Sequence, residues 1–81
     1  MIYQANLYQV EPTIYSRGYW VCQLEDEIPA SVMRKNFVPK EIWDMSHELF
    51  SFESNDPRKA VDQLVDRLKS FGLSGKLRIN K

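Results

Sequence analysis

The first residues to consider for chemistry are His47 and Glu48, a histidine directly followed by a carboxylate. An imidazole titrates near neutral pH, so a histidine that a carboxylate orients can act as a general base. However, the segment 47–54 alternates apolar and polar residues and is predicted as a strand, in which neighbouring side chains point to opposite faces. The two side chains would then not meet, and we predict a surface histidine rather than a catalytic base.

Cys22 and the acidic run Glu25-Asp26-Glu27 are the other candidates for chemistry. Cys22 has no basic neighbour in the sequence that would activate its thiol, so we predict a buried and unreactive side chain. The acidic run lacks the Asp/Asn spacing and the glycine of a calcium loop, and the sequence contains no glycine-rich phosphate loop. We therefore expect no metal site, no cofactor and no enzymatic activity.

The segment 55–73 has the clearest pattern in the chain and is predicted as a helix. Asp56 can cap its first N–H groups, and Pro57 suits the first helical turn. Gly72 can adopt the left-handed conformation that ends a helix, and Leu73 can then pack back on the last turn. The apolar residues of the segment share one helical face: Ala60, Val61, Leu64, Val65, Leu68 and Phe71. This face must lie on another apolar surface.

That surface is a predicted sheet. Four segments rich in alternating apolar residues are predicted as strands, at residues 2–10, 14–24, 47–54 and 76–80. With 81 residues the chain is expected to form a single domain over residues 1–81. The predicted fold is α+β, with a small, mainly antiparallel sheet of about four strands and one helix on one face, in the order β-β-β-α-β.

One helix leaves the other face of the sheet uncovered. If the helix covers the face that carries Trp20 and Leu24, the alternation places Tyr8, Tyr19 and Val21 on the open face. Aromatic residues with polar tips are enriched in protein interfaces. We therefore predict that Tyr8 and Tyr19 contact a protein partner, and that the open face supports a homodimer.

Residues 29–46 contain more apolar side chains than a solvated loop can hold, and they are bracketed by Pro29 and Pro39. Connections longer than roughly 12–15 residues are uncommon in small domains and are often functional. We predict Phe37 and Trp43 as the anchors of a partner contact, with Arg34, Lys35 and Lys40 as its polar rim. The alternative is that Phe37 and Trp43 cap the end of the core.

Charge is distributed unevenly along the chain. Residues 1–54 carry four basic and eight acidic residues, whereas residues 55–81 carry seven basic and three acidic ones. A nucleic acid could be contacted by the basic side chains Arg58, Lys59, Arg67, Lys69, Lys76 and Arg78. Asp62 and Asp66 interrupt this set and can pair locally with its cations, so a solvated helix face is the competing interpretation.

Two stretches resemble a known family. The strand GYWVCQL at Gly18–Leu24 and the strand-to-helix passage FSFESNDPRKAV at Phe50–Val61 are similar to the partial RNase H-like domain of HicB-type antitoxins. The resemblance covers about two thirds of the chain. It implies a non-catalytic, protein-binding domain that pairs with another copy of itself.

The expected function is that of a non-catalytic protein-binding module. It would act as a small inhibitor, antitoxin or anti-defence protein of phage or bacterial type, docking on a larger partner such as a nucleic-acid-processing complex. The alternative is an RNA- or DNA-binding accessory protein that uses the basic C-terminal helix and strand. No apolar run approaches the roughly 18 residues of a membrane span, and the N-terminus lacks a signal-peptide pattern, so we expect a cytoplasmic protein.

Overall fold

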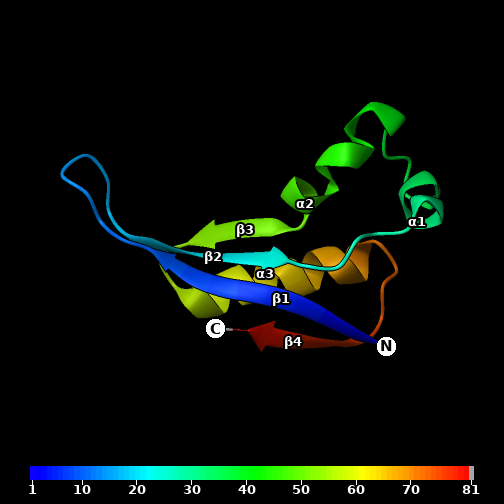
Figure 1. Cartoon of the computed structure of the whole chain (residues 1–81). Coiled ribbons are helices and arrows are strands. Elements are labelled where there is room, and N and C mark those ends of the chain that lie inside the picture. Colours follow the sequence, from blue (N-terminus) through cyan, green and yellow to red (C-terminus); the bar gives the residue numbers. More distant parts are fainter. Residues whose placement is uncertain (81) are drawn as a thin grey trace.

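Strand β1 (Ile2–Val10) lies inside a four-stranded sheet in the computed structural model, which describes residues 1–80 apart from the side chain of Ser46. The other strands are β2 (Tyr19–Leu24), β3 (Ser51–Ser54) and β4 (Lys76–Asn80), in the spatial order β3-β2-β1-β4 (Figure 1). Strand β2 is antiparallel to both β1 and β3, whereas β4 is parallel to β1. The predicted α+β fold with about four strands is confirmed.

Helix α3 (Pro57–Ser70) covers one face of this sheet, and both of its ends have the predicted capping residues. The Asp56 carboxylate accepts a hydrogen bond of 2.9 Å from the backbone N–H of Arg58. At the other end, Gly72 adopts a positive φ of 76° and the N–H of Leu73 returns to the carbonyl of Leu68 at 2.9 Å. The helix therefore begins and ends where its sequence predicts.

The core lies between α3 and the covered face of the sheet. The register places Ala5 opposite Leu24 and Leu7 opposite Cys22, so these side chains point towards the helix. The buried core consists of Tyr3, Ala5, Cys22, Leu24, Met33, Phe50, Ala60, Leu64 and Leu68. Helix α3 supplies three of these residues, Ala60, Leu64 and Leu68, from one stripe of its surface. Its apolar face is therefore buried by packing against the sheet.

The third strand is shorter than the sequence predicts. Residues Ser46–Leu49 form the short helix α2, and β3 begins only at Ser51. The backbone N–H of Phe50 closes the helical turn on the carbonyl of His47, and its own carbonyl accepts the N–H of Leu24 at 2.9 Å. Phe50 lies in the core with no exposed surface.

The second predicted strand is also shortened, because β2 begins at Tyr19 rather than at residue 14. Residues 11–18 form an arm that extends away from the sheet (Figure 1). Its turn is closed by Thr13, whose hydroxyl accepts the N–H groups of Tyr15 and Ser16, both at 3.1 Å. A threonine that binds its own neighbours competes with strand pairing, which accounts for the wrong prediction.

The long connection between β2 and β3 is mostly helical. It contains helix α1 (Ala30–Lys35) and the 3-10 helix η1 (Lys40–Met45), followed by α2. Met33 fixes α1 to the body, since only 1% of its surface is exposed. None of the helices within residues 1–80 is both long and apolar enough to cross a membrane.

Candidate interaction surface

Of the residues considered for catalysis, His47 lines one hollow together with Glu25, Asp26 and Glu27, whereas Cys22 lies in the core. His47 is exposed on α2, and on a helix, as on a strand, adjacent side chains such as His47 and Glu48 point in different directions. Cys22 is buried in the core without any exposed surface. Within residues 1–80, no group of three or more His, Cys, Asp or Glu side chains is placed to hold a metal ion.

Burial by apolar neighbours raises the pKa of the Cys22 thiol to about 11. At pH 8 only about one thiol in a thousand is then ionised, and the thiolate is the reactive species. We expect a thiol reagent at pH 8 to leave the native protein unmodified and to label it rapidly in urea. Rapid labelling of the native protein would show that Cys22 is accessible and would contradict its placement in the core.

The C-terminus of α1 carries an unusual residue. Phe37 has a φ of 59° and is the sole non-glycine residue with a positive φ in the described part of the chain. It occupies the left-handed position of a helix-ending motif, in which its N–H bonds to the carbonyl of Arg34 at 3.1 Å and the N–H of Val38 bonds to that of Met33 at 3.0 Å. This position normally belongs to glycine, because a Cβ atom clashes there.

The end of α3 provides an internal comparison, because it forms the same pair of hydrogen bonds around Gly72. The left-handed conformation costs an L-residue about 1–2 kcal/mol, and Phe37 recovers none of this by burial, since 92% of its surface is exposed. Such local strain often marks functional positions. Phe37 is therefore the strongest candidate for a binding residue.

Phe37 is also held firmly in place. The side-chain amide of the preceding residue, Asn36, donates to the carbonyl of Val32 at 2.9 Å and to that of Phe71 at 3.2 Å. The bond to Phe71 joins the end of α1 to the end of α3, while Met33 anchors α1 in the core. The exposed ring is thus presented by a packed part of the fold, which lowers the entropy lost on binding.

The second predicted anchor, Trp43, has a different environment. Its indole N–H donates to the carbonyl of Val38 at 2.9 Å, and its ring packs partly buried against the core. The guanidinium of Arg34 lies 5.8 Å from the centre of the indole ring. Trp43 therefore supports the segment that carries Phe37, and the two residues do not form one exposed patch.

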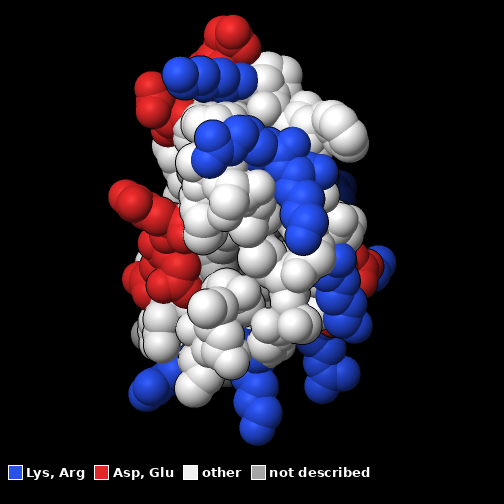
Figure 2. Space-filling model, turned by 90° about the vertical axis from the view of Figure 1, so that its right-hand side faces the viewer, with Lys and Arg blue, Asp and Glu red and all other residues white. Residues whose placement is uncertain are grey.

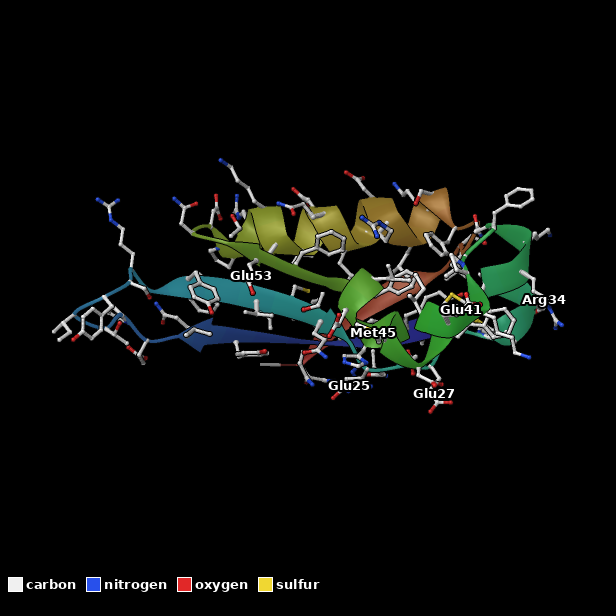
Figure 3. All side chains as sticks on the ribbon, turned by 90° about the horizontal axis from the view of Figure 1, so that it is seen from above. Glu25, Glu27, Arg34, Glu41, Met45 and Glu53 are labelled. Atoms are coloured by element: carbon white, nitrogen blue, oxygen red, sulfur yellow. The ribbon has the colours of Figure 1, made fainter. Side chains whose placement is uncertain are left out.

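The basic residues predicted as a polar rim lie near Phe37, on α1 and η1 at one end of the molecule (Figure 1). Arg34, Lys35 and Lys40 are all exposed, the first two on α1 and the third at the start of η1. Figure 2 looks onto this end and shows basic side chains around an uncharged centre, with acidic side chains gathered along one side. In Figure 3, Arg34 points away from the body, and Glu25 and Glu27 lie on the side of the sheet opposite α3.

The basic residues predicted for a nucleic acid are divided between two sides of the molecule. Lys76 and Arg78 alternate with the core-facing residues of β4 and so point away from α3, which carries the other four. Arg67 is engaged within the fold, because its guanidinium donates to the carbonyl of Leu49 at 3.1 Å and lies 5.2 Å from the centre of the Phe52 ring. The set Arg58, Lys59, Arg67, Lys69, Lys76 and Arg78 does not form one continuous basic surface.

The open face of the sheet contains the residues that alternation assigns to it. Tyr8 is 46% exposed and Tyr19 is partly buried. Val21 is paired with Tyr8 on one side and with Glu53 on the other, and only 5% of its surface is exposed. Much of the remaining face is polar, and the amide of Asn80 bridges Gln4 and Glu25 at 3.2 and 3.1 Å. The apolar residues on this face therefore form a small cluster at one end, around Tyr8, Tyr19 and Val21, with Ile2 at the other end.

Sequence reasoning missed the tip of the arm. Ile14 and Tyr15 stand side by side there, each with 91% of its surface exposed. The two sides of the arm approach closely at its base. A Cβ atom added to Gly18 would lie only 3.0 Å from the Pro12 side chain, so glycine is the residue that fits there. Pro12, Thr13 and Gly18 are turn-forming residue types, so their grouping was the signal that could have identified an exposed turn here.

Comparison of the chain with models of protein families, with curated proteins and with solved structures finds no match. The resemblance to HicB-type antitoxins therefore stays a prediction from two short stretches. Function has to be inferred from the surface around Phe37 and from the physical chemistry of its residues.

Proposed function

We propose that this chain is a non-catalytic protein-binding module that docks on another protein with Phe37 as the central contact. It would act as a small inhibitor, antitoxin or anti-defence protein of phage or bacterial type. One observation carries the proposal: a fully exposed aromatic ring stands at a strained backbone position that glycine would occupy at lower cost.

The energies favour a binding role for this ring. Burying a phenylalanine side chain under a partner contributes about 1.5–3 kcal/mol, which is as large as the strain of about 1–2 kcal/mol or larger. Aromatic and arginine side chains dominate the binding energy of protein interfaces, and Arg34 on the neighbouring helical turn adds such a contact. Lys35 and Lys40 would supply the polar rim and favour a partner with acidic groups around an apolar pocket.

Phe37→Gly tests the proposal, because its effects on stability and on binding should have opposite signs. Glycine relieves the strain, so we expect the free energy of unfolding to rise by up to about 1 kcal/mol, which corresponds to a few degrees in melting temperature. Affinity for the partner should fall by about 30-fold or more, because the anchoring ring is lost. Thermal melting and quantitative capture of proteins from host extracts measure the two effects.

Tyr15→Gly is the matched control, since it removes an equally exposed aromatic ring from the far end of the molecule. We expect this variant to capture the same proteins as the unmodified chain. Capture of other proteins and self-association that are both identical for Phe37→Gly and the unmodified chain would contradict the proposal. A Phe37→Gly variant that melts well below the unmodified chain would show that the ring is architectural instead.

A further inference from the structure

The end of the molecule that carries Phe37 also contains a hollow. It has a volume of about 440 Å³, and its walls are mostly apolar, formed by Met1, Ile2, Tyr3, Pro29, Val32 and Leu73. Met1 and Ile2 remain 87% and 61% exposed, so a considerable apolar area is left uncovered. Val32 lies on α1, and Phe37 stands two residues beyond its end, so the same short helix borders the hollow and presents the ring.

The charges around the two features are opposite. Phe37 follows Arg34 and Lys35, whereas the hollow is bordered by Asp26 and Glu27. All four of these charged residues are exposed. An apolar ring with a basic border therefore stands on the same end of the molecule as an apolar hollow with an acidic border.

We infer that the protein occupying this surface is a second copy of the chain, bound so that Phe37 of each copy enters the hollow of the other. Because the ring and the hollow share one end, a single two-fold axis forms both contacts at once and closes the assembly at two copies. Lys35 of each copy then lies near Glu27 of the other. The inference rests on the proposed function, because it names a second copy of the chain as the partner that Phe37 contacts.

This arrangement explains three features together. It covers the strained ring, it covers the exposed Met1 and Ile2, and it pairs the acidic and basic borders of the same end. The open face offers less, because its apolar cluster is small and Asn80, Gln4 and Glu25 already satisfy one another there. The arm with Ile14 and Tyr15 lies at the opposite end and remains free in such a dimer (Figure 1).

Analytical ultracentrifugation of the full chain over a wide concentration range tests the inference. We expect a reversible species with twice the mass of the chain, and we expect Phe37→Ala to weaken its formation by about 30-fold or more. Tyr15→Ala should leave the dimer unchanged. An unmodified chain that stays monomeric at all concentrations, or a dimer that Phe37→Ala does not weaken, overturns the inference.

A charge exchange tests the geometry without touching the ring. Glu27→Lys and Lys35→Glu each place like charges together twice in a symmetric dimer, so either variant alone should self-associate at least tenfold more weakly. Mixing the two variants restores opposite charges at both contacts, and we expect the mixture to form a heterodimer. Both residues are exposed, and folding is checked by melting each variant. A mixture that stays monomeric overturns the proposed pairing.

The two proposals fail in different ways. A monomeric chain that still captures a host protein through Phe37 refutes the second copy as the partner and leaves the binding role intact. Self-association and capture that are both insensitive to Phe37→Gly refute the binding role itself, and the inference falls with it.

Discussion

Phe50→Ala is expected to lower the free energy of unfolding by about 3–5 kcal/mol, the largest loss from any single truncation proposed for this chain. Phe50 has no exposed surface, and its ring contacts that of Phe71 edge to face at 5.0 Å between centroids and 71° between planes. Truncation removes this pair and leaves a cavity beneath α2, because the carbonyl of Phe50 is fixed by Leu24 and cannot relax inward freely.

A chain of this length has a total stability of about 4–12 kcal/mol, so Phe50→Ala should remove a large share of it. Urea titration followed by tryptophan fluorescence measures the loss. Phe37→Ala is the control, since the same change at an exposed ring should alter stability by no more than about 0.5 kcal/mol. Equal effects of the two substitutions would contradict the placement of Phe50 in the core.

Trp43→Ala is expected to have the second largest effect, a loss of about 2–4 kcal/mol. The indole ring is partly buried against the core, so its truncation should cost less than that of a fully buried aromatic residue. The change also removes the donor that satisfies the carbonyl of Val38 at 2.9 Å and the ring beside Arg34. The segment 38–45 should then loosen, and Phe37 should lose part of its fixed position.

Trp43→Phe separates the packing of the ring from its hydrogen bond, because phenylalanine retains most of the apolar contact. We expect this variant to lose about 1 kcal/mol. We expect the loss in melting temperature to be largest for Trp43→Ala, smaller for Trp43→Phe and smallest for Phe37→Ala. A Trp43→Ala variant that melts like the unmodified chain but has lost its partner would show that Trp43 is an anchor, as the sequence alone suggested.

The sequence determines the parts of this protein that depend on local periodicity and local capping. Helix α3 follows from the spacing of its apolar residues, and its ends follow from Asp56 and Gly72. Strand alternation correctly assigns Tyr8 to the open face and Cys22 to the covered one. These features need only neighbouring residues, since the periods of helix and strand are properties of the backbone itself.

Only the tertiary structure decides the features that depend on distant contacts. The carbonyl of Phe50 accepts the N–H of Leu24 and its ring contacts Phe71, and the first three residues of the strand expected at 47–54 belong to helix α2. The burial of Met33 fixes α1, and its carbonyl accepts the N–H of Val38 in the turn where Phe37 adopts the left-handed conformation. No pattern in the sequence indicates this conformation.

The separation of Phe37 from Trp43 has the same origin. Both are aromatic residues of one apolar segment, so the sequence predicts the same role for both. The carbonyl of Val38 captures the indole N–H of Trp43, while the helix-ending turn directs Phe37 into solvent. Which aromatic ring is packed and which is exposed is therefore set by hydrogen bonds to backbone carbonyls of the segment 33–38, and the residue types of the segment do not specify these bonds.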